Sequence, residues 1–399
     1  MSLGNATDRY GAVAKTFHWI TALGIFANLA LGFAAEWAPR GTEDEIALKT
    51  ALFSAHKTVG VAVFFVALLR ILWALAQPKP APLHPERRTE TLTADTVHWL
   101  LYGSLVLVPL SGWIGHAASE GFARIWWPFG QSLPLVPKSS ELAETAWTLH
   151  YVFMLVLVAS IVLHVAGAVK HHVVDKDATL RRMLPGTTRA ASPDGRHGIV
   201  LPFVLALAFW GVALAGGAAA GLFSGPEGGE SAALEDVDSE WEVQDGTLAI
   251  VVQQMGSEVR GEFADWTADI AFTPRDELGP AGEVTVQIAV PSLTLGSVTS
   301  EAKAPAYLAA EEHPTATFAA EILREADGWV ADGTVTLKGQ EAPVTMPFEL
   351  TLDGDTAEMR GTATLDRRNY EVGQSMDSED TVGFEVGVQV ELTAVRASE

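Results

Sequence analysis

Five long apolar segments dominate the first 224 residues of this 399-residue chain. They are Thr16–Ala35, Ala51–Ala76, Val97–Ala118, Trp147–Val169 and Ile199–Phe223. Each is long enough to cross about 30 Å of hydrocarbon as an α-helix. Because lipid offers no hydrogen-bond partners, a helix is the form in which such a segment satisfies its own backbone. The sequence therefore predicts a multi-pass helical membrane region.

The charges of the connecting loops predict the orientation of these segments. Lys79, Arg87 and Arg88 lie between the second and third segments, and a basic cluster that includes Lys170 and Arg181 follows the fourth. Loops rich in Lys and Arg stay on the cytoplasmic side of a membrane. We therefore expect a bacterial inner-membrane protein with a cytoplasmic amino terminus, whose residues after the fifth segment lie in the periplasm.

The second part of the chain differs from the first in charge. Up to Pro226 there are 17 Lys and Arg and 14 Asp and Glu, whereas from Glu227 onward there are 9 and 35. A surface this acidic argues against nucleic-acid binding, which needs a basic face. The chain has no cysteine, so disulfides, thiolate-held iron–sulfur clusters and thioether-linked haem are excluded.

The hydrophobic pattern also changes along the chain. Residues 225–240 are rich in Gly and carboxylates, which is typical of a flexible acidic linker. From Trp241 to Ala397, apolar and polar residues alternate in seven or eight short runs, such as EVTVQIAV and VGFEVGVQVEL, divided by Gly, Pro and Asp turns. This pattern predicts one antiparallel β-barrel or sandwich.

Four histidines occupy matching depths in the apolar segments. His18 and His164 lie toward the cytoplasmic side of the first and fourth segments, and His56 and His150 lie at the outer ends of the second and fourth. On a helix His150 and His164 share a face and stand about 21 Å apart. A neutral imidazole is a good axial ligand for haem iron, so two pairs predict two haem groups. Arg70 lies at the inner level and is expected to pair with a haem propionate.

The sequences around these histidines resemble a known family. The motifs RYGAVAKTFHW, SAHKTVG, TLHYVF and LHVAGAVKHH are similar to those of the bacterial cytochrome b561 family, which are di-haem, quinone-linked membrane cytochromes. The resemblance implies two haem b groups and electron transfer between ubiquinone and a partner at the outer face. Similar members include superoxide oxidases, which pass electrons from superoxide to ubiquinone. The family usually has four spans, so the fifth leaves the identity of the electron donor open.

Two further histidines follow the last predicted ligand at the inner surface. His171 and His172 stand beside Lys170. One interpretation is a solvated basic flank. The other is a quinone site, in which an imidazole donates a hydrogen bond to a quinone carbonyl and handles its proton.

The alternating region resembles a second family. GSEVRGEFADW, EEHPTATF, GTVTLKGQEAPVTMPFEL and ATLDRRNYEVG are similar to sequences of the YceI-like family, lipocalin-like barrels that bind long isoprenoid chains including quinones. An apolar lining and a filled apolar core read alike in sequence, so a filled barrel stays an alternative. The residues expected to line a lipid cavity are Phe263, Trp266, Phe272, Phe318 and Phe348.

These patterns divide the chain into a di-haem membrane domain (1–190), a fifth transmembrane helix (191–224), an acidic linker (225–240) and a periplasmic barrel (241–397). We expect electron transfer across the bilayer between a periplasmic donor, superoxide being one candidate, and the ubiquinone pool. Two other hypotheses remain open. The chain is an electron relay or accessory subunit of a respiratory complex, or it is a periplasmic quinone- or lipid-binding protein with a cytochrome anchor.

Overall fold

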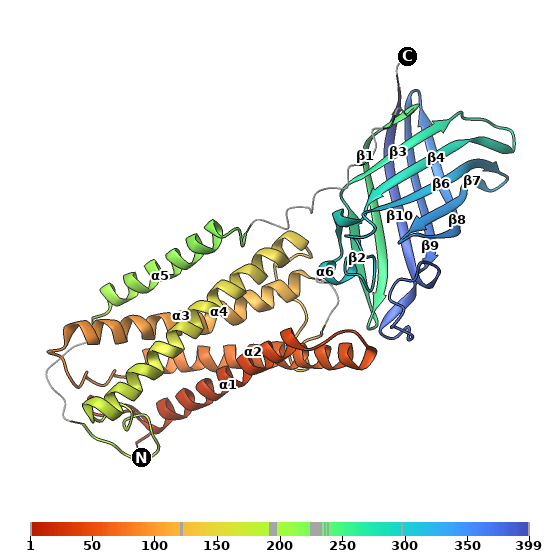
Figure 1. The fold of residues 1–399 in the computed structure, drawn as a ribbon. Coiled ribbons are helices and arrows are strands. Elements are labelled where there is room, and N and C mark those ends of the chain that lie inside the picture. The colour runs from red at the N-terminus through yellow and green to blue at the C-terminus, as the bar shows by residue number, and fades with distance from the viewer. Residues whose placement is uncertain are drawn as a thin grey trace. The chain divides into compact units, whose positions relative to one another are not determined.

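The computed structural model describes residues 2–119, 123–190, 198–223, 234, 237, 239–296 and 298–397. The predicted acidic linker lies largely outside these residues. The chain forms two compact units, a helical one and one built on a β-sheet (Figure 1).

Five helices of the first unit are long and apolar enough to cross a membrane. They are α1 (Ala12–Trp37), α2 (Glu43–Leu75), α3 (Arg88–Ala118), α4 (Ser140–Lys170) and α5 (Val200–Ala219). Each coincides with one of the five apolar segments, so the prediction of five spans is confirmed, although α5 ends four residues before the predicted segment does. In the most apolar 18-residue stretch of each helix, only 6% (α1) to 28% (α3) of the residues are buried within the protein. The other apolar side chains face outward, as they do in a helix surrounded by lipid.

The end regions of α4 show how local sequence sets its limits. Ser139 caps the amino end, where its hydroxyl accepts a hydrogen bond from the Leu142 backbone N–H at 3.2 Å. At the other end the helix widens into a single π-helical turn, His171–Asp175, and the chain leaves it through Lys176 in the left-handed conformation. This turn places His171 and Asp175 on one side of the chain.

Helix α5 packs against α3 and α4 in the helical unit (Figure 1). The ring of Trp210 occupies the space beside Gly103, where an added Cβ would lie 1.9 Å from it. Trp99 and Phe203 make a second ring contact between α3 and α5, with centroids 5.0 Å apart. The fifth span is therefore a packed part of the helical unit.

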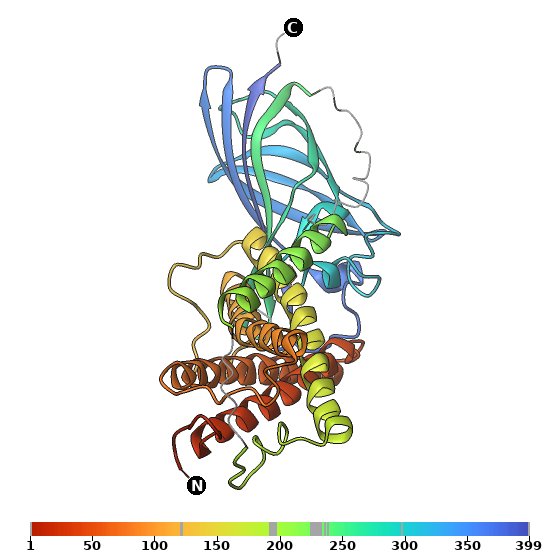
Figure 2. The ribbon, with the colours of Figure 1, turned by 90° about the vertical axis from the view of Figure 1, so that its left-hand side faces the viewer.

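Ten strands form one antiparallel sheet in the second unit. They are β1 (Trp241–Gln254), β2 (Ser257–Phe263), β3 (Trp266–Phe272), β4 (Gly279–Ala289), β5 (Leu293–Thr294), β6 (Thr315–Glu325), β7 (Gly328–Leu337), β8 (Gln340–Asp353), β9 (Thr356–Asp366) and β10 (Val382–Arg396). Their order in the sheet is β3-β4-β6-β7-β8-β9-β10-β1-β2-β5. The sheet curls on itself (Figures 1 and 2), as a YceI- or lipocalin-like barrel does.

Hydrogen bonds join β3, at one end of the strand order, to the start of β1. The Ile270 N–H of β3 donates to the Ser239 hydroxyl oxygen at 2.8 Å, and the indole N–H of Trp241 donates to the Phe272 carbonyl at 2.9 Å. The predicted barrel is confirmed, with more strands than the seven or eight expected. The additional strands are short, and β2 carries charges at Glu258 and Arg260 on its exposed face.

Candidate functional site

Two histidines meet between α2 and α4. The ring centroids of His56 and His150 are 6.3 Å apart and the rings are almost perpendicular. The Nδ1 of His56 lies 2.9 Å from the Asn28 carbonyl of α1, and the Nδ1 of His150 lies 2.8 Å from the Val108 carbonyl of α3. Since a carbonyl can only accept, each Nδ1 carries the proton and each Nε2 keeps its lone pair for a metal ion.

A second pair meets between α1 and α4. The ring centroids of His18 and His164 are 6.2 Å apart. The Arg70 guanidinium of α2 lies 3.3 Å from the Nδ1 of His18 and 5.5 Å from the Tyr102 ring centre. Here a cation, in place of a backbone carbonyl, is the neighbour of a ring nitrogen.

The spacing within each pair can be tested against haem ligation. A metal–imidazole bond is about 2 Å long and the ring centre lies about 1 Å farther on, so two imidazoles on opposite sides of one metal ion have centroids about 6 Å apart. Both pairs match this value. His98 also approaches His164, but at 5.2 Å, and its Nδ1 donates to the Ala94 carbonyl of its own helix at 2.6 Å. The two predicted pairs are the ones that fit two b-type haems.

Glycines leave room around the ligands. A Cβ at Gly32 would lie 2.9 Å from the His56 ring, and one at Gly112 would lie 2.8 Å from Nδ1 of His150. A Cβ at Gly167, one turn from His164, would have no neighbour within 4 Å. This open space is compatible with the approach of a flat macrocycle. The sequence does not single out Gly32 and Gly112, because the histidine rings beside them belong to other helices.

Basic and polar groups gather near the His56/His150 pair. Lys57 Nζ lies 3.3 Å from Nδ1 of His116 and donates to the Ala123 carbonyl at 2.9 Å. Nε2 of His116 lies 3.0 Å from the Gln131 side-chain oxygen. The exposed Trp126 and Trp127 follow in the same loop, as expected for an interfacial aromatic belt.

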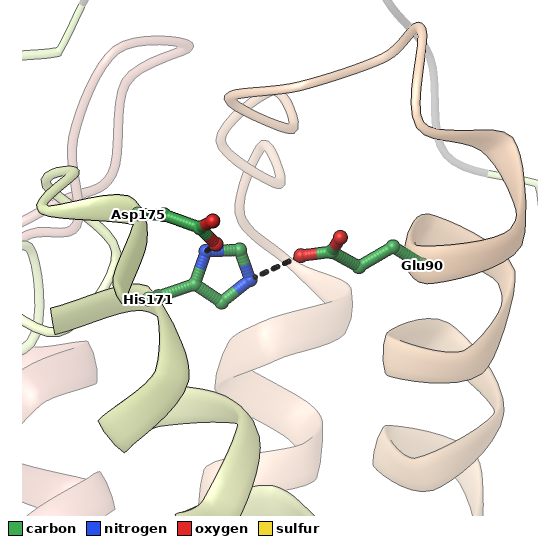
Figure 3. A group of neighbouring side chains, drawn as sticks. All are labelled: Glu90, His171 and Asp175. Carbon is green, nitrogen blue, oxygen red and sulfur yellow. Dashed lines mark ion pairs between the residues drawn. The ribbon is translucent and has the colours of Figure 1, made fainter. Parts of the chain in front are cut away.

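The other end of α4 carries a network of charges around His171. Its Nε2 lies 3.0 Å from Glu90 of α3, and its Nδ1 lies 3.1 Å from Asp175 (Figure 3). The same Nδ1 lies 2.7 Å from Asp177. Burial favours a raised pKa for the Asp177 carboxyl, but hydrogen bonds from Thr179 and His171 hold that pKa below its ordinary value. Both ring nitrogens of His171 thus have carboxylate partners, whereas His172 is exposed.

Cations balance the carboxylates of this network. Lys170 Nζ lies 2.8 Å from Glu90 and 2.9 Å from Asp175, and Arg87 lies 3.2 Å from Asp175. Glu90, His171 and Asp175 are close enough to share a metal ion. The adjacent ammonium and guanidinium groups already neutralise these acids, so the cluster is better described as an ion-pair network.

The barrel encloses an apolar cavity. Its volume is about 300 Å³, at the lower end of the range for ligand pockets. The five side chains expected to line it do so: Phe263, Trp266, Phe272, Phe318 and Phe348. A small group of polar residues, which sequence reasoning did not single out, lines part of the wall and includes Arg367 and Tyr370.

Comparisons with known proteins match the helical part of the chain. The family model described as prokaryotic cytochrome b561 matches residues 9–186. Cytochrome b561 homolog 2 of Escherichia coli (strain K12) is 29% identical over 191 residues, which are 46% of this chain and 95% of that protein. A probable superoxide oxidase of Yersinia pestis is 27% identical over 179 residues, 44% of this chain and 96% of that protein.

The second unit matches another family. The model for the YceI-like domain matches residues 241–394. The crystal structure of BcnA from Burkholderia cenocepacia is similar with 26% identity and a TM-score of 0.35, covering 38% of this chain and 96% of that one. The YceI protein of Campylobacter jejuni is similar with 17% identity and a TM-score of 0.29, covering 35% and 85%.

Proposed function

Because this chain joins a prokaryotic cytochrome b561 domain to a YceI-like domain, we propose that it is a di-haem b cytochrome of the bacterial inner membrane. It transfers electrons between a periplasmic donor and the ubiquinone pool, and its periplasmic barrel binds a quinone or another isoprenoid. The observation that carries the proposal is the presence of two histidine pairs with centroid spacings of 6.2 and 6.3 Å, both of which use α4.

The roles of the four histidines follow from their contacts. His18 and His164 hold the inner haem, and His56 and His150 hold the outer haem. Haem iron held by two imidazoles supplies one-electron chemistry without an exchangeable site. The carbonyls of Asn28 and Val108 fix the tautomer and the ring direction of the outer ligands.

The network around His171 provides a route for protons. Reduction of a quinone to a quinol consumes protons as well as electrons, and His171 connects Glu90 on one ring nitrogen with Asp177 on the other. We therefore assign His171, with the exposed His172 beside it, to the quinone site at the inner surface. Membrane lipids surround the same helices.

Superoxide is the donor that the outer surface supports best. Lys57 and His116 lie near the outer pair, and the exposed Arg124 and Lys138 add positive charge on that side. Such charge attracts a small anion. Each superoxide anion gives one electron and leaves as dioxygen, so two anions and two protons convert one ubiquinone to ubiquinol. The similarity to a probable superoxide oxidase supports this assignment.

A test of the donor uses the rate at which superoxide reduces the purified chain. Neutral variants of Arg124 and Lys138 are expected to slow this rate and to weaken its dependence on salt. An unchanged rate would argue against steering by these residues. If only quinol reduces the protein and a respiratory complex co-purifies with it, the relay hypothesis replaces the oxidase.

The haem assignment is tested by counting haem. We expect His56→Ala and His18→Ala each to lose one of two haem groups in a pyridine haemochrome assay, with one redox step missing. His84→Ala is the matched control, because His84 belongs to the charge network and to neither pair. Retention of both haems in either ligand variant would overturn the pairing.

We also propose the domain division 1–190, 191–224, 225–240 and 241–397. The cavity favours one alternative role for the last domain, that of a quinone or lipid carrier for which the cytochrome serves as membrane anchor. Extraction of the purified chain and identification of its lipids tests this role. The absence of any isoprenoid in the extract would contradict it.

A further inference from the structure

The few polar side chains of the barrel cavity gather at one end. A Cβ added at Gly373 would lie 3.1 Å from the Tyr307 ring and 3.2 Å from Nη1 of Arg367, so these two cavity-lining residues are neighbours. Gln254 pairs across strands with Val382, whose carbonyl accepts a hydrogen bond from Arg367. Tyr370 lies in the same short 3-10 helix as Arg367.

The opposite end of the cavity is apolar. Trp241 begins β1 and Gln254 ends it, so these two lining residues stand about 40 Å apart along the strand. Around Trp241 lie Phe272 and Ala357, which belong to one buried hydrophobic cluster. The cavity lining is therefore apolar at the Trp241 end and polar at the Gln254 end.

Arg367 places a buried positive charge at the polar end without offering a hydrogen bond. Its guanidinium is buried and donates to five backbone carbonyls, those of Val372, Gly373, Met376, Val382 and Gly383. These bonds use all five of its N–H groups. Within the described residues no carboxylate lies at ion-pair distance from it, although Asp366 and Asp377 interact with its charge at longer range and Glu301 also lines the cavity.

The hydroxyl of Tyr370, in contrast to the guanidinium of Arg367, is a hydrogen-bond donor that has no acceptor among the described residues. Its side chain is only 1% exposed, it lines the cavity, and within the described part of the chain its hydroxyl has no hydrogen-bond partner. Burial raises the pKa of this hydroxyl, so it stays a neutral O–H donor. The side-chain oxygen of Gln254 is likewise buried without a partner. Buried polar groups are normally satisfied, so this end of the cavity is built for a polar ligand group.

We propose that this end is a head-group subsite for a quinone, in which Tyr370 donates a hydrogen bond to a ring carbonyl. The inference rests on the proposed binding of a quinone or isoprenoid by the barrel, and it specifies which end of the ligand lies where. The isoprenoid tail lies along the apolar wall toward Trp241. The buried guanidinium of Arg367 and the free hydroxyl of Tyr370 favour an electron-rich carbonyl oxygen at this end.

A neutral carbonyl suits the subsite better than a phosphate. A phosphate monoester carries up to two negative charges and needs several donors to leave water. The guanidinium of Arg367 has no N–H group left to give, which leaves the hydroxyls of Tyr370 and Tyr307 and the amide of Gln254. The carboxylate of Glu301, which also lines the cavity, would repel a phosphate. The ligand class is therefore a neutral isoprenoid with a ring carbonyl.

The test measures equilibrium binding to the full-length haem-loaded protein in detergent after its native lipids have been removed. The probes are labelled ubiquinone-10, undecaprenyl phosphate and squalene, an isoprenoid without oxygen. The barrel's share of ubiquinone binding is the part that excess squalene displaces. Tyr370→Phe removes only the hydroxyl, and Tyr151→Phe, on an exposed position of α4, is the matched control.

We expect Tyr370→Phe to weaken the squalene-displaceable ubiquinone binding about fivefold, the effect of one neutral hydrogen bond of about 1 kcal/mol. Tyr370→Phe is expected to bind squalene as tightly as the wild type does. Tyr151→Phe is expected to bind both ubiquinone and squalene as the wild type does. The head-group subsite is wrong if Tyr370→Phe binds ubiquinone as tightly as the wild type does. It is also wrong if the variant loses as much affinity for squalene as for ubiquinone. In both cases the barrel still binds lipid. Stronger binding of undecaprenyl phosphate than of ubiquinone also overturns it. If the wild type shows no displaceable ubiquinone at all, the proposed function of the barrel fails instead.

Discussion

The guanidinium of Arg70 on α2 stands 3.3 Å from Nδ1 of His18 on α1, whereas the histidines of the other pair face backbone carbonyls. The two proposed haem sites therefore differ in their electrostatic surroundings. A fixed positive charge beside a ligand stabilises the electron-richer, reduced state of the site, and a carbonyl that accepts from Nδ1 makes the imidazole a stronger donor to the oxidised state.

The first prediction follows from this difference. Arg70→Gln is expected to lower the midpoint potential of the inner haem by on the order of 100 mV, since a charge at about 7 Å contributes about 2 kcal/mol at an effective dielectric constant of about 20. Arg70→Lys keeps the charge and serves as the control. A potentiometric titration followed by visible absorption measures both steps. An equal shift of both haems, or none, would contradict the assignment of Arg70 to the inner site.

The second prediction concerns the space beside His150. An alanine at Gly112 places a methyl group about where the ring now lies, 2.8 Å from Nδ1, and displaces the hydrogen bond to Val108. We expect Gly112→Ala to lose much of the outer haem while the inner haem is retained. Gly211→Ala is the control, because the added Cβ has no neighbour within 4 Å on α5. Haem content per chain and the number of redox steps measure the result.

A third prediction uses the absence of cysteine, which allows single cysteines to be introduced and labelled. In spheroplasts, a membrane-impermeant maleimide is expected to label Glu349→Cys on the exposed face of β8. It is expected to spare Glu86→Cys, an exposed position between α2 and α3, until the membrane is broken. The reverse pattern would invert the proposed topology.

The fourth prediction concerns pH. Hydrogen bonds from the Arg368 side chain and backbone hold the pKa of the Asp366 carboxyl below its ordinary value. A carboxyl whose pKa is lower in the folded state stabilises the fold above its unfolded pKa, and this contribution is lost as the pH falls through the folded pKa. We therefore expect the unfolding transition of the wild-type barrel to fall more steeply below about pH 4 than that of Asp366→Asn. Chemical denaturation followed by circular dichroism between pH 7 and pH 3 compares them, and identical profiles would contradict the effect.

The sequence was sufficient for features set by periodicity within one segment. The apolar lengths predicted all five spans, and the fourteen-residue separation of His150 and His164 predicted their common face. The alternating runs predicted the barrel, and the five aromatic candidates for its lining face the cavity. The order of charges in the loops predicted an orientation, which remains a prediction.

Features that depend on contacts between distant segments were not predictable in this way. Gly32 and Gly112 look like ordinary glycines in apolar helices until the rings of His56 and His150 are placed beside them. His171 reads as part of a basic flank, yet Glu90, eighty-one residues earlier in the chain, supplies one of its acidic neighbours. The strand β2 was missed because its buried Val259 stands between charged residues in a run of only seven.

Helix α4 contributes one imidazole to each pair, and this sharing has an evolutionary consequence. An insertion of a single residue between His150 and His164 would turn one ring by about 100° relative to the other and shift it by about 1.5 Å. Neither half of this helix can then change its length without dismantling one of the two sites. Related chains should consequently tolerate extra residues in the loops but not within this helix, whose length sets the distance between the two proposed haem sites.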